Sequence, residues 1–600
     1  MKLQEVILRN YRGFRISLQY IIAAREYDKK LKWCILCSDL CEGLNVNRWQ
    51  GWATMTNLKE QFYQTKNIEF LKKTLGRELW VQVSGSKDIN GASAAFWAAL
   101  MPVENIDEAY RDYSWNSYIG TQCPGFIEYG DKITYEANPL NFDSCLNIVQ
   151  YREFYGIKPN YVEISEEFRL LNNLYHDINT NIFYEIEENG ECTEVAKIIN
   201  NDCAYIKLKS LMKFAAAKQM ALLLFFDIRV KISGSLQKNG LKEFSTTVNE
   251  DGLFFGLWGG EQRLLETYSY SILMGKRILL PKPVEECGYE PYSRNEENEY
   301  PEYIIGIDEY GEPRSYTSNP AKLSNYFGAN PGAPHYLTPV FFKKEVLQRY
   351  LSRPNIFSVE AGYLRCQSLW GIEIDNEHKD MVSVYLGDLG RDLPVQEHSH
   401  WKQYNIATDA RLSTNAVKRD FLCAFTQPEI SDLKFKSNFK QFVNTWREQY
   451  QWDLFLPLSQ NDEYNFKTLH LPITDGQEEF DHLVLSLVKT MIDSLNEKEI
   501  VKQFKNPTDL KGGISKLEYW LSELNFPDYQ QQIKFLRNLQ ELRSTGTGHR
   551  KGKGYEKAAG VFGLNTDNYV DVFDRILLQA NAFILFLAKN FLKDWTVTLS

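Results

Sequence analysis

The sequence predicts a multidomain α+β protein, with mixed α/β N-terminal and middle regions followed by an all-α C-terminal bundle of four helices. Its 600 residues suffice for about three to five domains of ordinary size. Short apolar runs bounded by turn residues occur through the first two thirds of the chain, whereas from about residue 430 the apolar residues recur with the period of a helix. A content of 44 % hydrophobic and 14 % aromatic residues excludes wholesale disorder.

The composition predicts a cytoplasmic protein that does not cross a membrane. The chain begins Met1-Lys2-Leu3 without the basic and apolar regions of a secretory signal. Its longest apolar runs, 220–226 and 582–588, are far shorter than the roughly 18 residues that a membrane span needs. Ten scattered cysteines form no disulfide framework, which favours a reducing compartment. The net charge of −10 argues against nucleic-acid binding by the whole surface.

Changes in composition divide the chain into five predicted regions. The clearest unit has a strand at 205–208, a helix at 210–220 and a buried strand at 221–232. The window 281–316 has ten acidic residues, three basic residues and five prolines, which is typical of a solvated loop, here enclosing one strand at 303–307. In order, the regions are a mixed α/β N-terminal domain (1–150), an α/β domain (151–280), an acidic, proline-rich loop or linker (281–335), a β-rich domain (336–428) and a helical bundle (429–600).

Four amphipathic helices are predicted in the last region. In the first, the apolar residues from Phe480 to Leu495 follow the i, i+3, i+4, i+7 spacing of one helical face. The others cover 514–524, 533–542 and about 568–591, the last with Asn565 or Thr566 as its N-terminal cap. Helices with modest connections predict a bundle, antiparallel over 478–592. The core residues that we expect there include Leu487, Met491, Leu536, Ile576 and Ile584.

Several short motifs have simpler explanations than catalysis. Cys34 and Cys37 have the CxxC spacing, but they lie in an apolar run without a second ligand pair, so we expect core packing. His398 and His400 would share one face of an extended segment, yet no third ligand follows at a recognisable spacing, so we expect a surface pair. The glycines around His549 fit neither the dinucleotide fingerprint nor the Walker motif. We therefore expect no metal site and no cofactor.

The stretch from Leu542 to Gly552 suggests chemistry. Arg543 and His549 are separated by five residues at the end of a predicted amphipathic helix. They lie in a basic island, 530–557, whose seven basic and two acidic residues would attract a phosphate backbone. Histidine titrates near neutral pH and suits proton transfer, and a guanidinium suits a phosphate charge. An arginine and a histidine with six residues between them also occur outside the predicted bundle, at Arg169/His176 and Arg391/His398, so a separation of four to six residues is not rare in this chain.

This stretch resembles the Arg-x4–6-His signature of the HEPN superfamily, whose members include metal-independent RNases of bacterial defence and toxin systems. The resemblance covers roughly residues 478–592. It implies that His549 transfers protons during RNA cleavage and that Arg543 stabilises the phosphorane. Two features depart from the pattern: Ser544 follows the arginine, and Gly546 and Gly548 are predicted to break the helix that usually carries the motif. The residues expected to bind the substrate are Ser544, Thr545, Thr547, Arg550, Lys551 and Lys553.

Two functional hypotheses follow. The first is a defence- or toxin-type protein in which N-terminal and middle domains sense a trigger and the C-terminal HEPN-like bundle cuts RNA. The resemblance also implies a homodimer formed through that bundle. The alternative is a non-catalytic nucleic-acid-binding or scaffolding protein that uses the basic island at 543–557.

Overall fold

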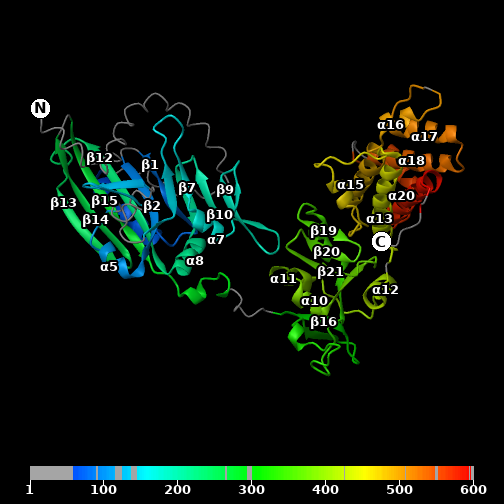
Figure 1. Cartoon of the computed structure of the whole chain (residues 1–600), viewed down its shortest axis with the longest axis horizontal. Coiled ribbons are helices and arrows are strands. Elements are labelled where there is room, and N and C mark those ends of the chain that lie inside the picture. Colours follow the sequence, from blue (N-terminus) through cyan, green and yellow to red (C-terminus); the bar gives the residue numbers. More distant parts are fainter. Residues whose placement is uncertain are drawn as a thin grey trace. The chain divides into compact units, whose positions relative to one another are not determined.

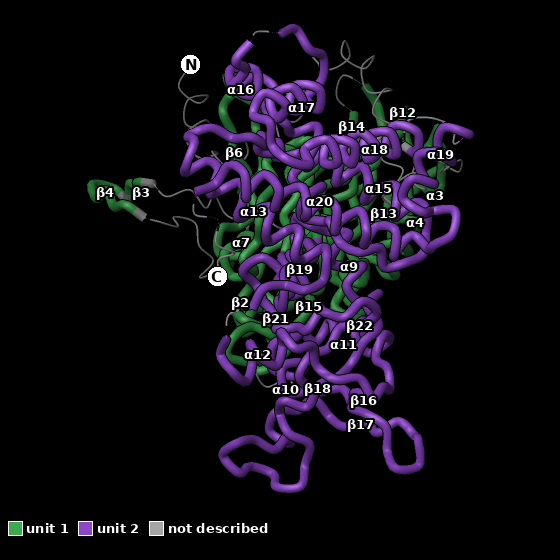
Figure 2. The backbone as a smooth tube through the Cα atoms, turned by 90° about the vertical axis from the view of Figure 1, so that its right-hand side faces the viewer, with its two compact units in different colours: residues 1–185, 194–295 green, residues 186–193, 296–600 purple. Residues whose placement is uncertain are grey.

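A large antiparallel sheet dominates the N-terminal and middle parts of the chain, and helices are concentrated in its C-terminal part (Figure 1). The fold is therefore of the mixed α+β kind. By their internal contacts, residues 1–185 and 194–295 form one unit, and residues 186–193 and 296–600 form a second (Figure 2). The computed structural model describes residues 58–89, 92–114, 125–136, 145–263, 266–292, 300–424, 426–506, 508–547, 552–593 and 595.

The sheet of the first unit contains eleven described strands, all paired antiparallel, in the order β13-β14-β15-β12-β2-β1-β11-β10-β9-β8, with β5 beside β2. It joins strands from the regions 1–150 and 151–280. The strands are β1 (Trp80–Ile89), β2 (Ala92–Pro102), β5 (Leu146–Asn147), β8 (Tyr175–Asp177), β9 (Ile182–Ile186), β10 (Cys192–Ile199), β11 (Cys203–Lys207), β12 (Met220–Ser233), β13 (Phe244–Glu250), β14 (Leu253–Arg263) and β15 (Thr267–Leu279).

One face of this sheet carries the main core of the first unit. Phe96, Phe226 and Phe255 lie on that face at exposures of 1–4 %, together with apolar residues of three helices. The predicted strand–helix–strand unit is confirmed, since α8 connects β11 to β12. The first nine residues of β12 are all buried, as expected for a near-continuous apolar run inside a sheet. The helices are α4 (Thr65–Lys73), α7 (Glu166–Leu171) and α8 (Leu208–Lys218).

The β-rich part of the second unit is more mixed than predicted. The acidic window encloses the hairpin β16–β17 rather than one strand, and Tyr303 of β16 is fully buried. Helices follow the strands, because the segments after Tyr385 carry apolar residues at helical rather than alternating spacing. The elements are β16 (Glu302–Ile307), β17 (Pro313–Thr317), β18 (Pro339–Lys343), α9 (Gln348–Leu351), β19 (Phe357–Glu360), β20 (Tyr363–Cys366), β21 (Trp370–Glu373), β22 (Met381–Tyr385), α10 (Leu386–Arg391), α11 (Val395–Gln403) and α12 (Thr414–Leu422).

The extended segment assumed for the two neighbouring histidines is wrong. His398 and His400 both lie on α11, which Pro394 precedes at its N-terminal cap. The Nε2 atom of His398 lies 3.0 Å from the Leu393 carbonyl oxygen, and that of His400 lies 2.9 Å from the Val346 carbonyl oxygen. His398 is buried and His400 half-buried, so the two rings are packed against backbone carbonyls rather than forming a surface pair. Cys34 and Cys37 lie outside the described residues.

The C-terminal part is helical, and all four predicted helices are present. The five predicted core residues have exposures of 0 %, which confirms the apolar faces of the helices. α13 was not among the four predicted helices, and it packs along α20. The helices are α13 (Ser431–Tyr450), α14 (Tyr464–Lys467), α15 (Gln477–Val488) with a π-helix at Lys489–Asp493, α16 (Glu497–Lys502), α17 (Gly513–Leu524), α18 (Tyr529–Thr547), α19 (Lys553–Val561) and α20 (Tyr569–Phe591).

The helix directions differ from a simple antiparallel bundle. α13 and α20 run the same way, since the Asn438 amide donates to Asn581 at 2.8 Å and Tyr450 donates to the Phe591 carbonyl at 2.6 Å. α15 and α20 begin at the same end, where the Phe480 ring lies 5.2 Å from that of Tyr569. Only long-range packing selects these directions, because an apolar stripe is the same whichever way its helix points.

Two predicted helix ends need correction. The cap of α20 is Asn568, whose side chain accepts a hydrogen bond from the Asp571 amide, rather than Asn565 or Thr566. Gly546 does not break its helix, because α18 continues to Thr547. A Cβ atom at Gly546 would lie 3.2 Å from the Tyr555 ring, so the glycine there allows close packing of α19.

Replacing Leu487 by alanine should destabilise the helical part by about 2–5 kcal/mol, because Leu487 is fully buried and the change leaves a cavity. Hydrogen exchange of the α15 amides, measured by mass spectrometry, should show this as faster exchange. Leu578→Ala on α20 is the matched control, since Leu578 is 49 % exposed. Equal exchange in the two variants would contradict the placement of Leu487 in the core.

Candidate functional site

Arg543 lies near the end of α18 and faces the π-helix that follows α15. Its Nη2 atom donates to Oδ2 of Asp493 at 3.1 Å. The two side chains are 32 % and 40 % exposed, and ion pairs this accessible contribute at most about 1 kcal/mol of stability. The main consequence of the pair is therefore orientation of the guanidinium at the surface.

The π-helix Lys489–Asp493 determines where Asp493 lies. Met491 and Ile492 within it are buried, and the Thr490 hydroxyl donates to the Ser486 carbonyl at 2.8 Å. Single π-turns within helices are frequent at functional sites. Sequence reasoning did not identify Asp493 as a site residue. Its one signal is a polar position opposite the apolar stripe, which many surface residues share.

α15 and α18 are antiparallel beside the site. A Cβ atom at Gly546 would lie 3.4 Å from Oδ1 of Asp481 near the start of α15, whereas Arg543, earlier in α18, reaches Asp493 beyond the end of α15. α19 completes this corner, because the Gln477 amide donates to the Tyr555 hydroxyl at 3.1 Å. Three helices thus surround the end of the helix that carries Arg543.

The remaining predicted site residues are only partly brought together. The hydroxyls of Ser544 and Thr545 both donate to the Glu541 carbonyl, at 3.0 and 2.7 Å, so each offers a substrate its lone pairs rather than its proton. Thr547 is the last residue of α18, and Lys553 is exposed in the first turn of α19. The other three predicted residues, His549, Arg550 and Lys551, lie outside the described residues.

Neighbouring acids reduce the charge of the basic island. Arg537 forms an ion pair with Glu518 of α17, as Arg543 does with Asp493. Lys553 and Lys557 of α19 are exposed. Lys534 of α18 is exposed as well, so the positive charge available to a phosphate backbone lies on both helices of the island.

The two other arginine–histidine pairs have structural roles. The ring of His176 stacks on Phe183 at 4.1 Å between centroids, and its Nε2 atom lies 2.8 Å from Oδ1 of Asn181. His398 is buried against a backbone carbonyl, and Arg391 contacts Asp392 and Asp388 on its own helix. The rings of His176 and His398 are thus each held by contacts with neighbouring residues.

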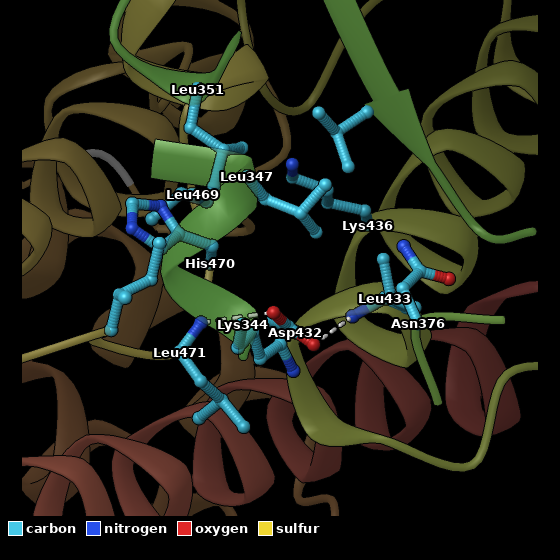
Figure 3. Close-up of a pocket in the computed structure, with 12 residues that line it drawn as sticks. Lys344, Leu347, Leu351, Asn376, Asp432, Leu433, Lys436, Leu469, His470 and Leu471 are labelled. Atoms are coloured by element: carbon cyan, nitrogen blue, oxygen red, sulfur yellow. Dashed lines mark hydrogen bonds between the residues drawn. The ribbon is translucent and has the colours of Figure 1, made fainter. Parts of the chain in front are cut away.

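A separate pocket lies between the β-rich and helical parts of the second unit (Figure 3). The volume open to the centres of water molecules is about 20 Å³. The pocket can therefore hold one or two waters but is too small for a substrate. Lys344 and Lys436 donate to the carbonyls of His378 and Lys467, and burial lowers the pKa of Lys436 to about 8. The pocket is lined by Lys344, Leu347, Leu351, Val359, Asn376, Asp432, Leu433, Lys436, Leu469, His470, Leu471 and Ile473.

In comparisons with protein-family models, curated proteins and solved structures, the chain matches none of them. No helix of the described residues combines the length and the apolar character that crossing a bilayer requires. A function for this chain is therefore inferred from its own residues, and Arg543 with Asp493 is the most specific arrangement at the predicted site.

Glu479 fixes the start of α15. Its carboxylate accepts hydrogen bonds from the Ile473 and Thr474 amides at 3.0 and 2.9 Å, from the Thr474 hydroxyl at 2.6 Å, and faces Nε2 of His470 at 3.1 Å. Burial raises the pKa of Glu479, but these contacts outweigh it and lower the pKa to about 2. The ionised Glu479 carboxylate therefore stabilises the folded state fully at pH values above its ordinary pKa of 4.5, and this stabilisation is lost as the pH falls towards 2.

Between pH 5 and pH 2, the free energy of unfolding of Glu479→Gln should fall by roughly 3 kcal/mol less than that of the wild type. Urea unfolding at a series of pH values measures this effect. Glu478→Gln changes an exposed neighbour in the same turn and is the control. Identical pH profiles for the wild type and Glu479→Gln would show that the carboxylate does not fix the helix start.

Proposed function

We propose that the C-terminal helices form a HEPN-like, metal-independent endoribonuclease in a defence- or toxin-type protein, with sensing by the remaining regions. The observation that carries this proposal is Arg543, held at the surface by Asp493 near the end of a helix that packs against α15 and α19. A fixed guanidinium with a histidine six positions later provides the two groups that metal-free RNA cleavage needs.

In the proposed reaction, the RNA 2′-hydroxyl attacks the adjacent phosphorus. A histidine accepts the hydroxyl proton, a bond forms from O2′ to phosphorus, and the bond to O5′ breaks after that oxygen receives a proton. The products are a 2′,3′-cyclic phosphate and a 5′-hydroxyl. Arg543 would stabilise the negative charge of the phosphorane. His549 from each of two copies would supply the base and the acid, consistent with a homodimer formed through the helices.

Asp493 would act on this step through Arg543. A guanidinium presents its donors in a planar fork, so fixing one edge also fixes the direction of the rest. Lys551, Lys553 and Arg550 would contact the neighbouring phosphates. The lone pairs of Ser544 and Thr545 would accept hydrogen bonds from the ribose or base.

Replacing either Arg543 or His549 by alanine should abolish RNA cleavage and leave RNA affinity largely intact, since loss of acid–base catalysis alone costs about 10²–10⁴ in rate. Cleavage of labelled RNA in EDTA, with analysis of the product ends, tests this. Arg537→Ala on the same helix is the control. Cleavage that requires Mg²⁺, or that survives His549→Ala, would place the reaction elsewhere.

Changing Lys551 and Lys553 together to glutamine should weaken RNA binding and flatten its salt dependence, by about 0.7 in slope for each lost single-strand contact. Binding by the cleavage-deficient Arg543→Ala protein over a series of salt concentrations measures the slope. Lys589→Gln, at an exposed lysine of α20 outside the island, is the control. Unchanged affinity at low salt would show that the island is an ordinary solvated surface. RNA binding without any cleavage by the wild type would favour the non-catalytic, scaffolding alternative.

A further inference from the structure

The second face of the large sheet buries a small apolar cluster around Leu223 and Phe225 and changes chemistry farther along β12. Along β12, Ile228 and Val230 are buried in the core face, whereas Arg229 and Lys231 between and after them are exposed. Half-exposed aromatic side chains continue this second face on the neighbouring strands. We call it the aromatic patch, and it consists of Arg229, Lys231, Trp258, Tyr268 and Tyr270.

Strand register places the patch on one side of the sheet. β15 lies between β12 and β14, and its Ile272 pairs with Arg229 of β12 and with Trp258 of β14. Lys231 of β12 pairs with Tyr270 of β15. Residues directly opposite one another in an antiparallel pair project from the same face. Tyr268 lies two residues from Tyr270 on β15 and therefore shares that face. Three adjacent strands thus present rings and cations together.

The guanidinium of Arg229 is held flat by Asp227. Its Nε atom lies 3.0 and 3.1 Å from the two carboxylate oxygens, and Nη2 lies 2.7 Å from Oδ2. Asp227 is 8 % exposed, while the Arg229 side chain is 51 % exposed. This arrangement buries the acid and neutralises it, and it fixes the outer guanidinium as a planar surface on which a base can stack.

Glycines on β14 let aromatic rings lie close to the strand. A Cβ atom on Gly260 would come within 3.1 Å of the Tyr270 hydroxyl and 3.3 Å of its ring, and one on Gly256 within 3.0 Å of the Tyr113 ring. The ammonium of Lys231 lies 4.1 Å from the Tyr268 ring centroid. Cation and ring are therefore adjacent, as recognition of a phosphate and its base requires.

We propose that the aromatic patch binds single-stranded nucleic acid, with bases stacked on Trp258, Tyr270 and the Arg229 guanidinium, and with phosphates contacted by Lys231. The exposed charged side chains of the patch are Arg229, which is paired with the buried Asp227, and Lys231; the resulting net positive charge favours a polyanion over a neutral carbohydrate as the occupant of the rings. This inference goes beyond the proposed nuclease, and the patch would bind whether or not the C-terminal site cleaves.

The test uses the full chain carrying Arg543→Ala together with Lys551→Gln and Lys553→Gln, so that cleavage is suppressed and RNA binding by the C-terminal island is weakened. The probes are labelled oligouridine and oligothymidine of about 12 nucleotides, within the usual range for such surfaces. Both should bind, because stacking does not read the 2′-hydroxyl. Trp258→Leu or Tyr270→Leu should weaken binding by about 5- to 150-fold, the value of one stacked base. Tyr155→Leu, at a residue 85 % exposed elsewhere in this unit, is the control.

Lys231→Gln gives a second measurement that does not depend on the packing of a ring, since Lys231 is exposed. Lys231→Gln should reduce the slope of log binding constant against log salt concentration by about 0.7. Wild-type affinity in the ring variants and in Lys231→Gln, equal binding of a duplex, or competition by a neutral oligosaccharide would each overturn the proposal. Absence of RNA cleavage by the wild-type chain, together with oligonucleotide binding that depends on the aromatic patch, would reject the nuclease and support the patch.

Discussion

Burial of a single apolar face organises both parts of this molecule. In the first unit, one face of the large sheet packs against helices, and β12 contributes to the centre of that core. In the C-terminal part, the stripe that includes Leu487 and Met491 packs against α18 and α20. Removing apolar area from water is the dominant favourable term in each case. The opposite face of the sheet buries a smaller apolar cluster around Leu223 and Phe225, and it carries polar and aromatic side chains farther along β12.

The corner around Arg543 depends on this packing, on one local departure from the regular α-helix and on one glycine within a helix. The π-helix after α15 brings Asp493 to Arg543, and Gly546 lets α19 approach the end of α18. Both features act where three helices meet. A single ion pair at the surface adds little stability, but it restricts a flexible cation to one direction.

Within the second unit, the turn between β21 and β22 connects the β-rich part to the helices. The Glu377 carboxylate accepts from the amides of Glu429 and Ile430 at the start of α13, at 3.0 and 3.2 Å. Lys379 lies 3.0 Å from Asp574 of α20. Because α20 begins beside α15, this turn contacts helices that lead directly to the candidate corner.

The sequence by itself determined the elements whose signal is local. Apolar spacing identified α15, α17, α18 and α20 with their buried residues, and the strand–helix–strand unit around α8, because burial of one face imposes that spacing whatever the partner. The sequence also predicted Arg543 as a site residue, since its position in an amphipathic helix of the predicted bundle distinguishes it from Arg169 and Arg391, and this remains a prediction.

Tertiary structure decided what local spacing cannot encode. The sheet order, the parallel course of α13 and α20, and the pairing of Asp493 with Arg543 all join residues far apart in sequence. The aromatic patch is a case of the same kind: alternation along each strand is visible in the sequence, but only strand register brings Arg229, Trp258 and Tyr270 to one face. Long-range pairing is chosen by the fit of whole surfaces, which no single segment contains.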